Sequence, residues 1–155
     1  MREEDLERIL VSEESIKKRV VELGREIDEY YEGKEILLVT LLNGAIVFTA
    51  DLIRNIRSPL WLDTLRVRSY GPEATSSGVP EITGDLRLPV EGVDVLLVDD
   101  ILDTGNTLSR VHIEILSRKP ASVRSCVLLD KTERRETPFQ ADWVGFPIPD
   151  HFVVG

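Results

Sequence analysis

The sequence predicts an α/β fold: a central, mainly parallel and twisted sheet with helices on both of its faces. Strand-like and helix-like stretches alternate along the chain, an order in which strands pair in parallel because each crossover contains a helix. The strand-like runs are apolar on consecutive residues, as is usual where helices cover both faces of a sheet. With 155 residues, 42% of them hydrophobic, the chain has the size of one domain with its own core. We therefore expect a single domain over residues 1–155.

The expected elements follow from apolar spacing and from turn residues. Residues 12–31 carry apolar side chains at alternating steps of four and three, with Glu13 and Glu14 in the first turn and Gly33 as the stop signal. This pattern predicts an amphipathic helix. The remaining elements are expected to be a strand at 36–42, a helix that ends before residue 58, strands at 60–67 and 93–98, a helix at 107–118 and a strand at 123–129.

Two segments lack this regularity. Residues 70–84 hold Gly, Pro, Ser and Thr with little apolar content, and a stretch of this length inside a compact domain is typical of a functional lid. We expect a lid at about 69–84. The tail from Phe139, rich in aromatic residues and proline, predicts a small irregular cap.

Composition narrows the kinds of partner and metal. A formal net charge of -9 argues against affinity for nucleic acid, which depends on clustered lysine and arginine. Without a bilayer-length apolar run or a secretory signal pattern, we expect a cytoplasmic protein that does not bind membranes. Cys126 is the single cysteine, and no cysteine or histidine cluster has the spacing of a zinc site. Any metal must therefore bind oxygen ligands.

Three carboxylates follow the apolar run at 93–98. Asp99, Asp100 and Asp103 fall where that strand should end, and in open parallel sheets ligands bind beyond the carboxyl ends of the strands. Two adjacent carboxylates after a hydrophobic strand are costly to leave unpaired. They suit a divalent cation or the hydroxyl groups of a sugar.

Residues 103–107, Asp-Thr-Gly-Asn-Thr, lead into the helix expected at 107–118. A helix N-terminus offers free backbone N–H groups and the positive end of the helix dipole to an anion. Gly105 permits close approach of the backbone, and the Thr104 and Thr107 hydroxyls can donate. The plainer alternative is that Asp103 or Thr107 merely caps the helix. The combination of apolar strand, acidic pair and this loop favours a phosphate site.

This combination closely resembles the signature by which phosphoribosyltransferases hold 5-phosphoribosyl-1-pyrophosphate. The resemblance covers nearly the whole chain, and together its motifs resemble the hypoxanthine-guanine phosphoribosyltransferases. The further matching segments are 41–45 (pyrophosphate loop), 66–71 (root of the catalytic flexible loop), and 128–132 with 141–150 (purine pocket).

The resemblance implies a role for each matching residue. Asp103 would be the general base, and the phosphoribosyl group would be held by Asp99, Asp100, Asp103, Thr104, Gly105, Asn106 and Thr107. Pyrophosphate would contact Leu42, Asn43, Gly44, Ser69 and Tyr70. The purine would meet Lys131, the stacked ring of Trp143 and backbone groups of Val144. Magnesium (Mg²⁺) would be held by Asp99 and Asp100, with a second ion at Asp150.

The resemblance also implies the type I fold, with a purine-pocket hood built from about 131–155 and the N-terminal segment. The implied reaction is purine salvage, in which 5-phosphoribosyl-1-pyrophosphate and hypoxanthine or guanine give IMP or GMP and pyrophosphate. The implied assembly is a homodimer or homotetramer. One residue departs from the pattern, because the family commonly has a lysine where this chain has Asn43, often after a non-proline cis peptide.

Other interpretations remain open. Relatives with this fold include regulators that sense the ribose pyrophosphate and bind nucleic acid, although the acidic charge weighs against that. An enzyme for xanthine or a pyrimidine is a further alternative. Taken singly, Lys131 fits a solvated surface lysine and Trp143 fits packing. His112 and His151 fit packing or surface positions, and Cys126 fits the core.

Overall fold

The structure is a computed structural model that describes residues 9–68 and 80–153. One six-stranded sheet runs in the order β3-β2-β1-β4-β5-β6, and all neighbouring strands are parallel except β2 and β3. The strands are β1 (Ile36–Leu42), β2 (Leu60–Arg68), β3 (Glu81–Thr83), β4 (Asp94–Leu102), β5 (Ser122–Asp130) and β6 (Trp143–Pro147). The helices are α1 (Glu13–Tyr31), α2 (Ile46–Ile53), α3 (Asn106–Ser117) and the 3₁₀ helix η2 (Thr132–Arg134).

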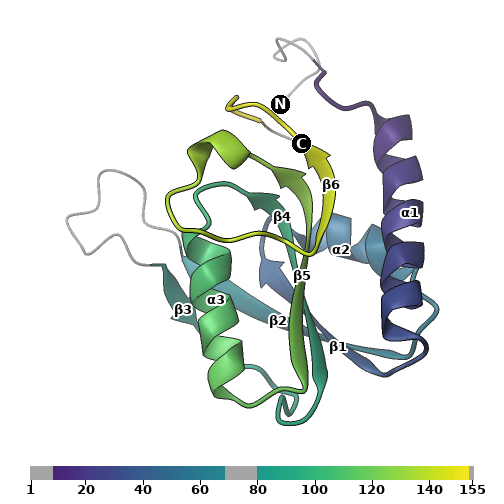
Figure 1. Ribbon diagram of the computed structural model, residues 1–155, viewed down its shortest axis with the longest axis vertical. Coiled ribbons are helices and arrows are strands. Elements are labelled where there is room, and N and C mark those ends of the chain that lie inside the picture. Colours follow the sequence, from purple (N-terminus) through teal and green to yellow (C-terminus); the bar gives the residue numbers. More distant parts are fainter. Residues whose placement is uncertain (1–8, 69–79, 154–155) are drawn as a thin grey trace.

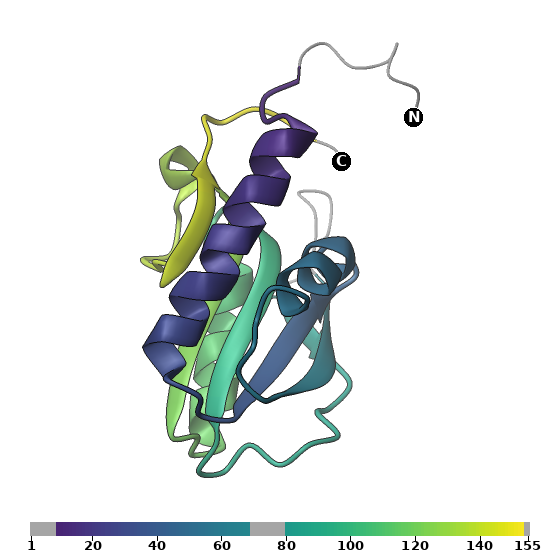
Figure 2. The ribbon, with the colours of Figure 1, turned by 90° about the vertical axis from the view of Figure 1, so that its right-hand side faces the viewer.

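The helices form layers on both faces of this sheet, as expected. Helices α1 and α2 cover one face and α3 covers the other (Figures 1 and 2). Strand β1 is buried along almost its whole length because its side chains alternate between two cores. Leu37 and Val39 pack on the α3 side, whereas Ile36 and Leu38 pack on the α1 and α2 side.

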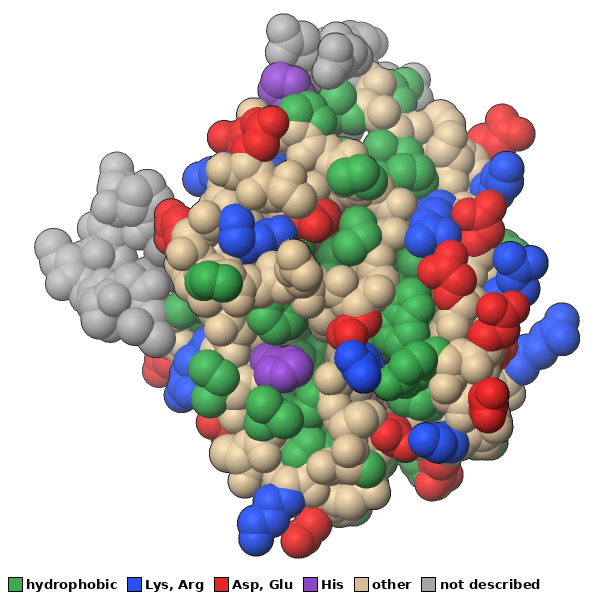
Figure 3. All heavy atoms as spheres, in the orientation of Figure 1, with side chains coloured by type: hydrophobic (Ala, Val, Ile, Leu, Met, Phe, Trp, Pro, Cys, Tyr) green, Lys and Arg blue, Asp and Glu red, His purple; other side chains and the backbone are tan. Residues whose placement is uncertain are grey.

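Helix α1 forms where the apolar spacing predicts it. The side chain of Ser12 caps its N-terminus by accepting a hydrogen bond from the backbone N–H of Ser15 at 3.2 Å. The chain leaves the helix at Glu32 in the left-handed conformation, one residue before Gly33. Acidic and basic side chains are interspersed over the outer surface of α1, as Figure 3 shows. The helix therefore presents an apolar side to the sheet and a charged side to solvent.

Several expected boundaries differ from those observed. Strand β4 continues through Asp99 and Asp100 to Leu102, beyond the strand expected at 93–98. The expected cap after Phe139 contains a true strand, β6, parallel to β5. Proline and aromatic residues obscured this strand, which lies at the edge of the sheet, where proline is tolerated.

The segment expected to act as a lid, 69–84, lies largely outside the described residues. Its last part, Glu81–Thr83, is strand β3, which pairs with the end of β2. The side chain of Ile82 packs against the core on the α3 side. Residues 81–83 therefore belong to the sheet, and the lid expectation concerns the residues that precede them.

Cys126 lies in the core with no solvent exposure, as expected. Within 9–68 and 80–153, none of the helices combines the length and the apolar character needed to cross a bilayer.

Candidate active site

The carboxyl ends of β1 and β4, neighbours at the centre of the sheet, bring two predicted site segments together. The turn after β1 holds Asn43 and Gly44, and the Leu42–Asn43 peptide bond is cis. Gly44 lies against the carboxylate of Asp100 so closely that a Cβ at this position would overlap it. The sheet thus places the turn at residues 42–44 beside the acidic pair.

Asp99 and Asp100 differ in their surroundings. The Asp99 carboxylate accepts a hydrogen bond from the backbone N–H of Asp100 at 3.0 Å. Burial, followed by the neighbouring Asp100 carboxyl, raises the pKa of Asp99 well above its ordinary value. A divalent cation would relieve this unfavourable pair of charges, and carboxylate oxygens are the donors that magnesium prefers.

These two carboxylates do not form a complete protein cage. Among the described residues, no group of three acidic, histidine or cysteine side chains is placed to hold one metal ion. Magnesium is commonly held by one or two carboxylates together with substrate phosphates and water. Asp99 and Asp100 therefore fit an ion that also binds the substrate.

The loop at residues 103–107, the cradle loop, enters α3 without a side-chain cap. Gly105 is the N-cap residue, in the left-handed conformation with φ 86°, and it supplies no side-chain cap. The Thr104 hydroxyl oxygen accepts from the backbone N–H of Asn106 at 3.3 Å. The interpretation of Asp103 or Thr107 as a simple cap is therefore wrong, and the N-terminus of α3 can receive an anion.

The side chain of Asp103 is buried at its Oδ1 atom, which has no hydrogen-bond partner among the described residues. The Arg134 Nε lies 3.4 Å from this atom, within ion-pair range but not hydrogen-bonded. A buried carboxylate oxygen without a donor is costly unless a ligand supplies one. Asp103 is thus available to a proton donor at this edge of the sheet.

Lys131 is placed at the same edge. It follows the last residue of β5, its backbone N–H donates to the carbonyl of Leu102 at 2.9 Å, and its residue surface is 4% exposed. The interpretation of Lys131 as a solvated surface lysine is wrong.

Asn106 has a different position from the one expected. Its side-chain amide donates to Glu136 at 2.9 Å, and its oxygen accepts from the Thr137 hydroxyl. The Asn106 side chain is thus bonded to residues 136 and 137, while its backbone N–H donates to the Thr104 hydroxyl.

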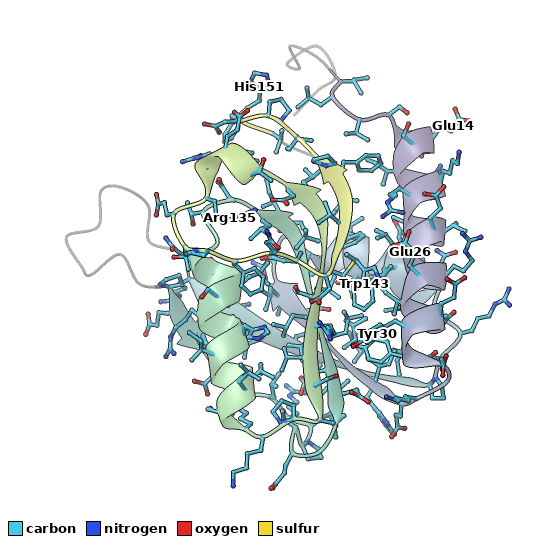
Figure 4. All side chains as sticks on the ribbon, in the orientation of Figure 1. Glu14, Glu26, Tyr30, Arg135, Trp143 and His151 are labelled. Carbon is cyan, nitrogen blue, oxygen red and sulfur yellow. The ribbon has the colours of Figure 1, made fainter. Side chains whose placement is uncertain are left out.

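Trp143 and Val144, expected at the purine, both lie against α1 in the structure. Trp143, the first residue of β6, pairs with Cys126 at the middle of β5. Its ring packs edge-on against Tyr30, with 5.3 Å between the ring centroids. Figure 4 shows Trp143 and Tyr30 together beside α1. The carbonyl of Val144 accepts from Arg19 of α1 at 2.9 Å. Both residues therefore hold β6 against α1. They are the first two residues of β6, whereas ligands of parallel sheets bind beyond the carboxyl ends of the strands.

Asp150 does not join the acidic pair. Its carboxylate lies 3.7 Å from the guanidinium of Arg134, which also approaches Asp103. The ion expected at Asp150 is separate from the ion expected at Asp99 and Asp100, so this position does not test it and the role of Asp150 stays a prediction. Ser69 and Tyr70, expected at pyrophosphate, lie outside the described residues.

Two features of this edge were missed in the sequence. Phe152, which follows β6, is an aromatic ring with 93% of its residue surface exposed. Both Arg134 and Arg135 contact Asp103. The Arg134 guanidinium lies near the Asp103 carboxylate, and the Arg135 guanidinium donates to the Asp103 main-chain carbonyl. The sequence signal for Phe152 is an aromatic residue shortly after the last strand.

The fold and the site together define a class of protein. The family model described as a phosphoribosyl transferase domain matches residues 9–155, so the chain is a phosphoribosyltransferase. Among curated relatives, the hypoxanthine-guanine phosphoribosyltransferase of Aquifex aeolicus (strain VF5) is 48% identical over 149 residues, which are 96% of this chain and 84% of the relative. That of Bacillus subtilis (strain 168) is 44% identical over 155 residues, with 100% and 86% covered.

Solved structures agree. The hypoxanthine phosphoribosyltransferase of Trypanosoma cruzi, described as a ternary substrates complex of a mutant, superposes with a TM-score of 0.91 at 40% identity, covering 98% of this chain and 87% of that one. A hypoxanthine-guanine phosphoribosyltransferase of Bacillus anthracis gives 0.89 at 37% identity, with 96% and 87% covered. The chain belongs to the hypoxanthine-guanine phosphoribosyltransferase family, enzymes of purine salvage with the type I fold that generally need a divalent metal.

Proposed function

We propose that the protein transfers the 5-phosphoribosyl group of 5-phosphoribosyl-1-pyrophosphate to hypoxanthine or guanine. The products are IMP or GMP and pyrophosphate. The observation that carries this proposal is the uncapped N-terminus of α3, with Gly105 at its start and the buried Asp99 carboxylate close by on β4. The α3 N-terminus supplies amides for a phosphate, and the acidic pair supplies acceptors for ribose hydroxyls.

In the reaction, the bond between the anomeric carbon and pyrophosphate breaks and a bond to a purine ring nitrogen forms. Positive charge develops on the ribose ring, as in other glycosyl transfers. Asp99 and Asp100, together with the substrate, would hold a magnesium ion, which would supply positive charge toward the pyrophosphate. Asn43 and Gly44, beside Asp100, present their turn to the same leaving group. Asn43 lacks the positive charge of the lysine common at this position. Its turn therefore binds pyrophosphate through neutral amide groups.

Asp103 accepts the proton that the purine nitrogen loses. Its Oδ1 atom is buried and lacks a donor, which suits an acceptor that a substrate N–H satisfies. The Arg134 guanidinium lies 3.4 Å from this atom. Within the cradle loop, the backbone N–H groups leading into α3 bind the 5-phosphate.

The purine pocket is built from Lys131 and the segment after β6. Lys131 is buried at the end of β5 and donates to the 6-oxo group. The exposed ring of Phe152 replaces Trp143 as the residue that stacks on the base, since base–aromatic stacking contributes about 1–3 kcal/mol. Residues 131–153, with the N-terminal segment before α1, form the hood of a single domain.

The segment between β2 and β3 completes the site. We assign residues 69–79 the role of the lid that excludes water, with Ser69 and Tyr70 at pyrophosphate. Its position in the chain supports this, because β2 ends beside β1, whose following turn faces the leaving group.

We also propose a homodimer or homotetramer in the cytoplasm. Exposed apolar side chains such as Val47 and Trp61 suit an interface between copies. The phosphorylated substrates suit a cytoplasmic location, since such charged molecules do not cross membranes unaided. Light scattering after size exclusion measures the assembly directly.

The experiment that tests the function is a magnesium-dependent assay of nucleotide formation. The ribose pyrophosphate is mixed in turn with hypoxanthine, guanine, xanthine and one pyrimidine, and products are separated by chromatography. We expect IMP and GMP, with no pyrimidine nucleotide. Absence of both purine nucleotides, or preferential turnover of xanthine or the pyrimidine, would contradict the proposal.

A further inference from the structure

The cradle loop is held from behind by residues 131–137, here called the backing segment. The backbone N–H groups of Glu136 and Thr137 both donate to the carbonyl of Thr104, at 2.9 and 3.0 Å. Lys131 donates to the carbonyl of Leu102, immediately before the loop. The backing segment therefore contacts successive peptides of the cradle loop, so its position determines where the loop N–H groups point.

Arg135 adds a charged contact to this set. Its Nη1 donates to the main-chain carbonyl of Asp103 at 2.5 Å, while its Nη2 donates to the carboxylate of Asp130 at the end of β5. The Arg135 and Asp130 side chains are 16% and 13% exposed. Figure 4 shows Arg135 near the N-terminal end of α3, well away from Trp143. The planar guanidinium thus joins a rigid strand end to the peptide of Asp103.

There is little free space between the two segments. A Cβ on Gly105 would overlap the carbonyl oxygen of Thr137 and would lie 3.0 Å from Cδ of Arg135. Close packing of this kind transmits a displacement of one segment to the other instead of absorbing it. Movement of Arg135 would therefore move the loop.

We infer that Arg135, oriented by Asp130, is a positioning residue for the phosphoribosyl site. It fixes the Asp103–Thr104 peptide, and so sets both the direction of the Asp103 carboxylate and the spacing of the N–H groups at the start of α3. This inference rests on the proposed function, because it is the phosphoribosyl group that those atoms would hold. In this proposal Arg135 contacts neither the anomeric carbon nor the purine nitrogen between which the new bond forms.

The ion pair of Arg124 and Asp142 provides a matched comparison. Arg124 also extends from the β5 region and pairs with an aspartate, at 2.8 Å, but its other contact is the hydroxyl of Tyr30 on α1. Its side chain is 42% exposed and it contacts the α1 side of the molecule. Loss of Arg124 removes a buttressing ion pair without touching the cradle loop.

The test compares Arg135→Met, Arg135→Lys and Arg124→Met in the complete protein. For Arg135→Met we expect KM for the ribose pyrophosphate to rise about tenfold and kcat to fall about tenfold, with KM for hypoxanthine within about threefold. Arg135→Lys should recover only part of the loss. A lysine keeps the positive charge, but its ammonium cannot bond the Asp103 carbonyl and the Asp130 carboxylate together as the planar guanidinium does. Arg124→Met should keep wild-type kinetics. Equal kinetics for Arg135→Met and Arg124→Met would overturn the inference.

Amide hydrogen exchange of residues 103–107 without substrate separates this inference from the proposed function. We expect exchange there to be about tenfold faster in Arg135→Met than in the wild type or Arg124→Met. Unchanged exchange would overturn the inference even if the wild type is active. A wild type that forms no nucleotide would sink the proposed function, and the exchange rates would still decide whether Arg135 orders the loop.

Discussion

Gly44, in the turn after β1, lies directly against the carboxylate of Asp100 at the end of β4, and no side chain fits between them. The contact joins the turn that we propose for pyrophosphate to the acidic pair that we propose for the ribose and the metal. Any residue larger than glycine must displace one of the two. The distance between the turn and the acidic pair is thus set by direct packing of the Gly44 backbone on the Asp100 carboxylate.

Gly44→Ala should therefore damage catalysis more than stability. We expect kcat/KM for the ribose pyrophosphate to fall about a hundredfold, the effect of misplacing reacting groups by about 1 Å. Gly92→Ala is the control, because its Cβ meets open space but its φ of 74° makes alanine unfavourable. That control should lose about 1 kcal/mol of unfolding free energy and keep its activity. Similar kinetics for the two variants would argue against the contact.

Asp103→Asn tests the proton acceptor. An amide is similar in shape but cannot take the purine proton, so kcat should fall about 10²- to 10⁴-fold. The thermal midpoint should stay close to that of the wild type, since Oδ1 accepts no hydrogen bond among the described residues and the bond from Arg134 to Oδ2 is long, at 3.4 Å. A variant with the wild-type rate would remove Asp103 from this role.

Trp143 and Phe152 should respond in opposite ways. Trp143→Phe removes part of the packing on Tyr30, so it should lower the unfolding free energy by about 1–3 kcal/mol while KM for hypoxanthine stays within about twofold. Phe152→Ala should leave stability unchanged, because the ring is exposed. It should raise KM for hypoxanthine at least about fivefold through lost stacking. The reverse pattern in purine kinetics would restore Trp143 to the pocket.

Asp28 provides a pH-dependent part of the stability. Burial alone would raise the pKa of Asp28, but hydrogen bonds from the backbone N–H groups of Arg57 and Ser58 outweigh it and hold the pKa below its ordinary value of 3.8. A lowered folded-state pKa stabilises the fold above pH 3.8, and this contribution is lost as the pH falls through the folded-state pKa.

Asp28→Asn should accordingly lower the unfolding free energy by about 1–2 kcal/mol at neutral pH. The difference from the wild type should shrink in denaturant titrations at progressively lower pH, down to about pH 3. Asp51→Asn removes a partner of the exposed Arg54 and should change little at any pH. A deficit for Asp28→Asn that persisted unchanged into acid would contradict this account.

Much of the fold could be predicted from local patterns. The α1 helix follows from apolar periodicity with Ser12 as its cap, and β1 follows from a run that is buried on both faces. Strand β6 could not be predicted this way, because an edge strand depends on pairing with β5, which is a non-local contact. The extension of β4 through Asp99 was hidden for a similar reason, since charged residues have low strand propensity.

The candidate site could be predicted where its residues are consecutive in the sequence. The loop from Asp103 to Thr107 enters a helix, so its local sequence indicates its chemistry. The proposed purine pocket depends on which residues reach the carboxyl edge of the sheet, and the register of β6 places Trp143 opposite Cys126, before that edge. The partnership of Arg135 with Asp130 and Asp103 likewise arises from tertiary contact.

The most direct measurement is a calorimetric titration of the protein with 5-phosphoribosyl-1-pyrophosphate in magnesium buffer. We predict saturable binding with one ligand per chain, strongly weakened by a magnesium chelator and by Gly44→Ala. No heat at millimolar ligand, or equal binding with and without the metal, would contradict the claim that the acidic pair and the α3 N-terminus together hold the phosphoribosyl group.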